Sequence, residues 1–337
     1  MKGRERRARL RVVMLNRSSM LYHVLIFCLV LLSALVFTSL DEARRAILGA
    51  KPGVRLEGRD VGGMLPDEVR DVVEDISELR RRSPKDAMFY KESGQVIPEV
   101  KGIDVDVDET VRRVLEAAPG EDVELATFEI VPAITGRHFE PLRAVDTDRQ
   151  DMALTVNVAW GEEYLPQMLD ILRENNVRAT FFFDGQWVKL YPDLVKRIAD
   201  GGHEIANHGY EHIHVKDASE VVLRELITKN EEMLNQLTGK AAKLFAPPYG
   251  ECTDRVIATA GSLGYRTVLW TIDTIDWKKP PAAQIIKRAT EKARPGAIIL
   301  MHPTAPTIEA LPEIIRTLHQ RGYWLGTVSD LLARNSS

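Results

Sequence analysis

The sequence predicts an α/β protein in which a distorted (β/α) barrel follows a small α+β domain and an N-terminal transmembrane helix. Three observations lead to this prediction. Strand-like and helix-like segments alternate over residues 151–333, a pattern typical of a parallel sheet covered by helices. A shorter region of mixed pattern, 53–134, precedes them, and an apolar run covers residues 20–40.

Composition limits the class of protein. Of the 337 residues, 45% are hydrophobic and 28% are charged, as in a normal globular chain, which argues against general disorder. The formal net charge is −4, so the chain lacks the overall basic charge with which proteins attract nucleic acid. We therefore expect no nucleic-acid partner.

The apolar run 20–40 reads MLYHVLIFCLVLLSALVFTSL and contains no Asp, Glu, Lys or Arg. It is about as long as a helix that crosses a bilayer. The basic segment 1–19 before it predicts a cytoplasmic N-terminus and export of the remainder. A cleaved signal peptide is the alternative, but its apolar core is usually shorter, roughly 7–15 residues. We expect a single-pass anchor in the cell membrane, with the barrel outside.

The region 53–134 predicts the small α+β domain. LPDEVRDVVEDISELRRR and DVDETVRRVLEAAPG have apolar residues at helical spacing, and VELATFEIVP alternates like a strand. With GVRLEGRDVGGMLPDEV, these motifs resemble small domains associated with peptidoglycan binding that precede VanW-type proteins. A spacer that holds the barrel away from the membrane is the alternative. Residues 135–150 are expected to be a linker.

The elements of 151–333 follow one another as strand and helix. Residues 152–159 alternate apolar with small or polar residues, and a helix with Leu165, Met168 and Leu172 on one face comes next. A long helix is expected from about Ser219 to Gly239. The further expected strands are VRATFFF, HEIANH, AKLFAPPYG, YRTVLWTID, GAIILMH and YWLGTV.

Polar clusters stand at the ends of successive strands, where barrels of this kind carry their chemistry. In NHGYEHIH, the H-x-x-x-H spacing of His208 and His212 allows two imidazoles to bind one cation, although two structural histidines would fit equally well. FAPPYG predicts a rigid turn, and DTIDW places Asp276 after an aromatic strand. His302 ends a very apolar strand and is a candidate general acid.

These motifs, in this order, resemble the polysaccharide deacetylases with a NodB-type homology domain, carbohydrate esterase family four, over roughly 151–332. NVAWGEEY, FAPPYG and LMHPTAPT are most like the sporulation-associated YlxY-type subgroup. The resemblance implies a distorted (β/α) barrel of the NodB type. It also implies hydrolysis of the acetamido C–N bond of peptidoglycan or another N-acetylglucosamine-containing glycan, with a divalent metal such as zinc.

The resemblance further implies roles for single residues. His208 and His212 match the metal-binding histidines, and His302, oriented by Asp276, matches the acid that protonates the departing amine. Tyr249 lies in the turn whose backbone helps to hold the oxyanion. The residues expected to contact substrate are Trp160, Pro248 and Trp277.

One motif departs from the family pattern. TVNVAWG stands where family members read T-F-D-D-G, so Asn157 replaces the base and Val158 replaces a metal-binding aspartate. The arginine that pairs with the base is Ala246 here. Because an unpaired buried charge costs several kcal/mol, loss of the base makes a small neutral neighbour the compatible choice.

Two functions therefore stay open. One is a metal-assisted deacetylase with altered chemistry, which would need a third metal ligand such as Glu162, Glu163 or His214. The other is an inactive, deacetylase-like glycan-binding or scaffold protein of the cell envelope. A soluble cytoplasmic hydrolase is disfavoured by the predicted anchor.

Overall fold

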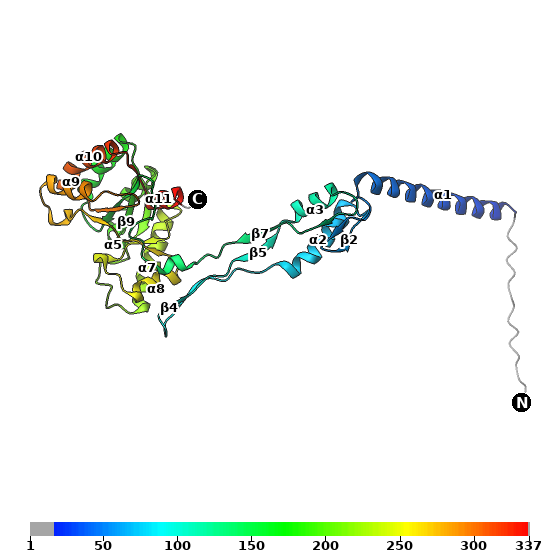
Figure 1. The fold of residues 1–337 in the computed structure, drawn as a ribbon, viewed down its shortest axis with the longest axis horizontal. Helices are drawn as coiled ribbons and strands as arrows, with labels where there is room; N and C mark the ends of the chain where they lie inside the picture. The colour runs from blue at the N-terminus through cyan, green and yellow to red at the C-terminus, as the bar shows by residue number, and fades with distance from the viewer. Residues whose placement is uncertain (1–16, 336–337) are drawn as a thin grey trace, which may run out of the picture. The chain divides into compact units, whose positions relative to one another are not determined.

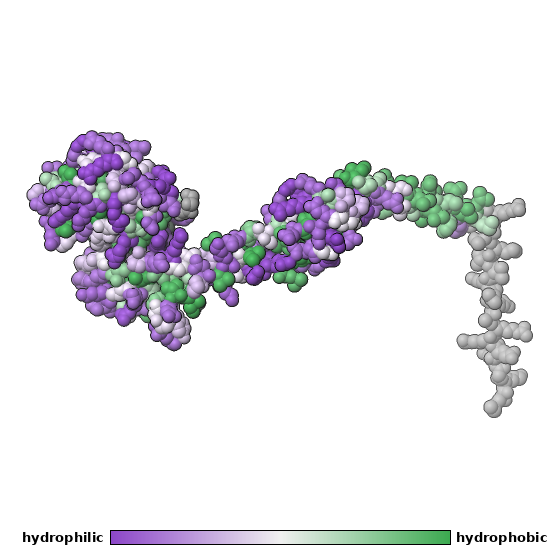
Figure 2. All heavy atoms as spheres, in the orientation of Figure 1, coloured by the Kyte–Doolittle hydropathy of each residue, from purple (hydrophilic) through white to green (hydrophobic). Residues whose placement is uncertain are grey.

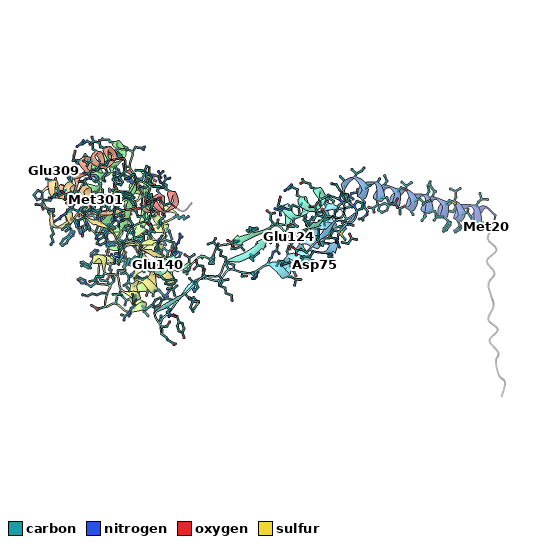
Figure 3. All side chains as sticks on the ribbon, viewed as in Figure 1. Met20, Asp75, Glu124, Glu140, Met301 and Glu309 are labelled. Atoms are coloured by element: carbon teal, nitrogen blue, oxygen red, sulfur yellow. The ribbon has the colours of Figure 1, made fainter. Side chains whose placement is uncertain are left out.

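The computed structural model describes residues 17–335, and Figure 1 shows their fold. The described chain forms two compact units. The first unit consists of the described residues up to Ser83 together with Gly102–Ile130. The second unit consists of Pro84–Lys101 and the described residues from Val131 onward. Figure 3 labels Asp75 and Glu124 in the first unit and Met301 and Glu309 in the second. Of the expected basic segment 1–19, residues 1–16 lie outside the described residues.

The first unit begins with helix α1 (Arg17–Leu48). Its stretch Met20–Leu48 is long and apolar enough to cross a membrane. Large apolar side chains are exposed along it, Phe27 and Phe37 among them, and Figure 2 shows them as a run of green atoms. In water such a helix would have no partner for its apolar surface, so this exposure agrees with the predicted span 20–40 without placing it in a bilayer.

The rest of the first unit packs two helices on short strands. Asp106 accepts a hydrogen bond from the Glu109 backbone N–H and so caps the second of these helices. Its core is formed by small β-branched residues such as Val69, Val73 and Val114, which are fully buried. The elements are β1 (Arg55–Leu56), β2 (Arg59–Asp60), α2 (Pro66–Arg80), β5 (Gly102–Val105), α3 (Val107–Glu116), β6 (Asp122–Val123) and β7 (Thr127–Ile130).

The hairpin of β3 (Met88–Tyr90) and β4 (Gln95–Ile97) is grouped with the second unit, although its residues fall inside the predicted domain 53–134. The ring of Phe89 stacks on that of Phe139, with centroids 6.3 Å apart. Residues 135–150, expected as a linker, also pack on this unit. They form a short helix η1 (Gly136–Phe139), and the side chain of Phe139 is buried.

The second unit is built on a parallel sheet. Its strands are β8 (Asp151–Val158), β9 (Thr180–Phe183), β10 (Glu204–Asn207), β11 (Leu244–Phe245), β12 (Arg266–Thr267), β13 (Ile272–Asp273), β14 (Ile298–Met301) and β15 (Trp324–Gly326). The order is β12-β11-β10-β9-β8-β14-β13, with β15 also beside β8. Because β12 and β13 end this order, the barrel is distorted rather than regularly closed. The predicted distorted (β/α) barrel is confirmed.

Helices surround this sheet (Figure 1). The predicted long helix is confirmed as α7, which begins after its cap Ser219 and ends at Gly239. The helices are α4 (Leu165–Glu174), α5 (Gly185–Leu190), α6 (Pro192–Asp200), α7 (Glu220–Thr238), α8 (Asp254–Ser262), α9 (Ala282–Glu291), α10 (Ala305–Gln320) and α11 (Val328–Arg334). Short 3-10 turns are η2 (Glu162–Tyr164), η3 (Pro248–Gly250) and η4 (Asp276–Lys278).

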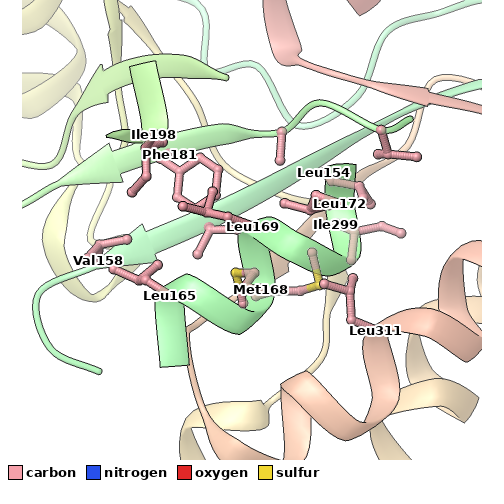
Figure 4. Close-up of a cluster of buried hydrophobic side chains, with 14 of the residues drawn as sticks. Leu154, Val158, Leu165, Met168, Leu169, Leu172, Phe181, Ile198, Ile299 and Leu311 are labelled. Carbon is pink, nitrogen blue, oxygen red and sulfur yellow. The ribbon is translucent and has the colours of Figure 1, made fainter. Parts of the chain in front are cut away.

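Strand β8 is buried along its whole length, and its two faces meet different groups of residues. Leu154 and Val158 belong to the large cluster formed with helix α4, where Leu165 lies next to Val158 (Figure 4). Ala153 belongs to a second cluster, with Phe182 of β9, inside the barrel. Since side chains alternate along a strand, Asn157 lies on the inner face and Val158 on the helix-covered face.

Candidate functional site

A cavity of about 690 Å³ lies at the carboxyl ends of the barrel strands. The sequence-predicted site residues that line it are Asn157, Trp160, His208, His212, Tyr249, Trp277 and His302. Ala159, Gly250, Trp270, Asp273, Lys279 and Leu300 complete the lining. Residues from six strand ends and loops thus meet in one place, as the rule for such barrels predicts. Pro248, which was also expected to contact substrate, is buried and does not line the cavity, although the next residue, Tyr249, does.

The end of β8 brings no carboxylate to the cavity. The Asn157 amide lines it, whereas Val158 is fully buried in the core with Leu165. An amide does not accept a proton at neutral pH, and a valine does not bind a metal. Ala246 is likewise buried and neutral, so the inner wall here has neither a base nor an arginine.

The two histidines of the H-x-x-x-H motif lie together, with ring centroids 5.0 Å apart. His208 Nδ1 donates to the Ala246 carbonyl at 2.6 Å, which assigns the neutral tautomer with Nε2 unprotonated. Burial, helped by the neighbouring His212, lowers the pKa of His208 to about 3. Burial also lowers the pKa of His212. Both rings are therefore neutral at pH 7, the form that binds a metal.

A divalent metal would need more ligands than these two rings. Catalytic zinc sites generally have three protein ligands. Among the described residues, no group of three or more His, Cys, Asp or Glu side chains is placed to hold a metal ion. The residues present therefore do not fit the family's catalytic metal.

The three residues considered as a third ligand point to other partners or lie away from the cavity. Glu162 accepts a hydrogen bond from the Tyr191 hydroxyl at 2.8 Å. His214 Nδ1 lies 2.8 Å from the Glu251 carboxylate. None of Glu162, Glu163 and His214 lines the cavity.

His302 is held by a buried carboxylate. Its Nδ1 and its backbone N–H both donate to the fully buried Asp276, at 2.8 and 2.7 Å. The Thr307 hydroxyl donates to the same carboxylate at 2.7 Å. This arrangement fixes the imidazole and leaves its Nε2 for the cavity. Thr307 was not predicted from the sequence; its only signal is its place one helical turn after the cap Thr304.

Aromatic rings form much of the cavity wall. The Trp160 ring is nearly parallel to that of His302, at 5° and 5.8 Å between centroids. Trp277 and Tyr249 are about half exposed, although the Tyr249 ring stacks on that of His214, with centroids 4.1 Å apart. Tyr249 adopts a positive φ of 58°. The turn continues through Gly250, where a Cβ would lie only 2.5 Å from Cη2 of Trp270.

The fold, the order of the strand-end motifs and the comparisons together define the class. Residues 144–268 match the family model described as polysaccharide deacetylase. A peptidoglycan-N-acetylglucosamine deacetylase of Bacillus cereus is 35% identical over 194 residues, which cover 56% of this chain and 91% of that protein. The chain belongs to the polysaccharide deacetylase family.

Further matches cover a larger part of this chain. The uncharacterized protein YlxY of Bacillus subtilis is 37% identical over 238 residues, covering 70% of this chain and 75% of that protein. The crystal structure of BA3943 of Bacillus anthracis, described as a CE4 family pseudoenzyme, has a TM-score of 0.57 and 33% identity over 78% of this chain and 94% of that one. A mutant of BA3943 with restored enzymatic activity matches with the same TM-score at 32% identity, over 78% of this chain and 97% of the mutant's.

Proposed function

We propose that this protein is anchored in the cell membrane and binds an N-acetylated cell-wall glycan, such as peptidoglycan, in the cavity without hydrolysing it. One observation carries the proposal. Aromatic side chains and His302, which Asp276 holds from behind, line a sugar-sized cavity, whereas the only polar side chain that β8 offers it is the amide of Asn157. The cavity thus keeps groups that could bind a sugar, but it lacks the carboxylates that would activate a water molecule.

The chemistry of amide hydrolysis explains why this loss matters. A water molecule must lose a proton as it attacks, and a positioned base typically contributes a factor of about 10²–10⁴ to the rate. A metal ion supplies further stabilisation of the developing negative charge. Asn157 and Val158 supply neither, and His208 and His212 alone form an incomplete ligand set.

Binding of a glycan requires a cavity of suitable size with apolar and polar contacts, but neither a base nor a metal ion. Ligand cavities of about 300–1,000 Å³ are typical for small molecules, and the volume of about 690 Å³ falls in this range. The exposed parts of the Trp160 and Trp277 side chains offer apolar contact area for a sugar ring or an acetyl group. His302, fixed by Asp276, supplies a polar group at a defined place.

Membrane anchoring is supported by α1, whose apolar side chains are exposed along Met20–Leu48. The basic residues before it favour a cytoplasmic N-terminus, which would place the barrel outside, where cell-wall glycan is found. We propose the first unit as a spacer or a second peptidoglycan-binding module.

Calorimetry with the full-length protein in detergent micelles tests this function. Chitotetraose should bind saturably, and Trp277→Ala should weaken binding by about tenfold because it removes a half-exposed stacking face. Leu190→Ala removes an exposed apolar side chain that does not line the cavity and should leave binding unchanged. Heat signals that do not saturate, or equal effects of the two variants, would reject the proposal.

A second candidate is weak, metal-assisted deacetylation. The intact contact between His302 Nδ1 and Asp276 favours it, because a general acid is retained. Asn157→Asp would return a carboxylate to the inner face of β8. If acetate release by the wild-type protein with added zinc exceeds that of His302→Ala, the second candidate replaces the first.

A further inference from the structure

We propose that Lys279 binds a carboxylate of the bound glycan, so that the cavity prefers an acidic glycan to a neutral one. This inference rests on the proposed glycan binding and names the class of glycan. Lys279 lines the cavity and is exposed, and it follows directly after η4, the turn that carries Trp277.

The loop that carries Lys279 contains strained backbone conformations. Ile275 and Lys279 bracket η4, and both have left-handed backbones, with φ of 54° and 51°. Tyr249, on the same cavity, has a φ of 58°. Among the described non-glycine residues only five have positive φ, and these three lie at or beside the cavity. Strain of this kind costs about 1–3 kcal/mol per residue and concentrates at binding sites.

Hydrogen bonds hold the loop in this conformation. The Lys279 N–H donates to the Asp276 carbonyl at 2.8 Å, and the Ile275 N–H donates to the Asp273 carboxylate at 2.8 Å. The same residue that orients His302 therefore also fixes the backbone of Lys279. The backbone from which the lysine side chain extends is therefore fixed relative to His302.

The charges around the cavity leave the Lys279 ammonium available. Among the residues that line the cavity, Lys279 is the only Lys or Arg and Asp273 is the only Asp or Glu. One oxygen of Asp273 is already committed to the loop. In the described part of the chain, no carboxylate lies within ion-pair distance of the Lys279 ammonium. The adjacent Lys278 lies over the Trp277 ring instead.

A neutral glycan gives such an ammonium nothing to pair with. A carboxylate on the sugar does, because an ammonium attracts it as a point charge and the aromatic walls exclude part of the surrounding water. Carboxylates occur on amino-sugar chains as the lactyl ether of muramic acid and on acidic polysaccharides as the ring carboxylate of uronic acids. Both sources share the chemistry that Lys279 would recognise.

Competition calorimetry on the full-length protein in detergent micelles tests the inference. The ligands are chitotetraose, a peptide-free muramic-acid-containing glycan tetrasaccharide, its methyl ester, and an oligouronate of equal length. The muramic-acid tetrasaccharide should bind about three- to tenfold more tightly than its ester, as expected for one partly exposed ion pair. Lys279→Gln should abolish that preference, and Lys279→Arg should retain it.

Lys287→Gln is the matched control, because Lys287 is exposed on α9 away from the cavity lining. A muramic preference that survives Lys279→Gln, or equal affinity of the wild-type protein for acid and ester, overturns the inference while glycan binding stands. Binding of none of the four ligands rejects the proposed function and this inference together. Tighter binding of the oligouronate than of the muramic-acid chain identifies uronic acids as the source of the carboxylate.

Discussion

The buried carboxylate of Asp276 accepts two hydrogen bonds from His302 and one from Thr307. Asp276→Ala would leave these buried donors without partners. We expect a loss of about 2–4 kcal/mol in the free energy of unfolding, measured by urea denaturation. Asp217→Ala, at an exposed aspartate, should change it by less than about 0.5 kcal/mol. Similar losses in both variants would contradict the structural role of Asp276.

Asp184 makes stability depend on pH. It is buried, one of its oxygens has no hydrogen-bond partner among the described residues, and burial raises its pKa from 3.8 to about 6, with a further contribution from Glu211. The folded state thus binds this proton more tightly than the unfolded state. Stability is therefore fully present below pH 4 and falls as the pH rises to about 6, by up to about 3 kcal/mol.

Asp184→Asn removes this dependence. Asparagine can still accept the hydrogen bond from the Trp187 N–H that caps α5. The difference in unfolding free energy between variant and wild type should therefore shift in favour of the variant between pH 4 and pH 7. Thermal unfolding followed at several pH values measures this difference, and a constant difference would show that the Asp184 proton is not tightly held.

Much of the site at this scale could be predicted from the sequence. Asn157, His208 and His302 lie at the ends of strands with a clear pattern, and His212 follows in the loop after His208. The period of two along β8 already separated Asn157 from Val158. The contacts of Thr307 could not be predicted. They join residues whose separation along the chain is 31 positions, and only the folded barrel brings such groups together.

At the scale of elements, the turn η3 shapes the cavity next to Tyr249. Gly250→Ala would place a methyl group 2.5 Å from Trp270 and put a side chain on a residue with φ of 67°. We expect destabilisation by about 2–4 kcal/mol and weaker chitotetraose binding. Gly239→Ala has a similar φ of 79° but nothing within 4 Å of the new Cβ.

Gly239→Ala therefore measures the backbone cost alone, about 1 kcal/mol, and should leave binding unchanged. Urea denaturation and calorimetry of both variants separate the two effects. If Gly250→Ala costs no more than Gly239→Ala, the contact with Trp270 does not constrain the turn.

The elements most reliably predicted are those with long, regular patterns. The period-two strand β8 and the capped helix α7 match their expected ranges. The packing of 84–101 and 135–150 on the second unit could not be predicted, because it depends on tertiary contacts such as that of Phe89 with Phe139. The sequence placed 84–101 in the small α+β domain and 135–150 in a linker, because neither pattern reveals the surface on which the segment packs.

At the scale of the whole molecule, α1 should decide where the protein is found. The full-length chain should sediment with membranes and resist a carbonate wash, because the apolar side chains of α1 are exposed over residues 20–40. A chain lacking residues 1–48 should appear in the soluble fraction if it folds. Recovery of the full-length chain in the soluble fraction would contradict anchoring by α1.

The central claim is that the cavity binds an N-acetylated glycan and leaves its acetyl groups in place. One proton NMR experiment tests both parts on the same sample, with the full-length protein in detergent micelles, chitotetraose and added zinc. Saturation transfer from protein to sugar reports binding, and the methyl signal of free acetate reports hydrolysis. We predict saturation transfer with no acetate beyond that of His302→Ala. Acetate that accumulates only when His302 is present would contradict the claim, and so would the absence of saturation transfer.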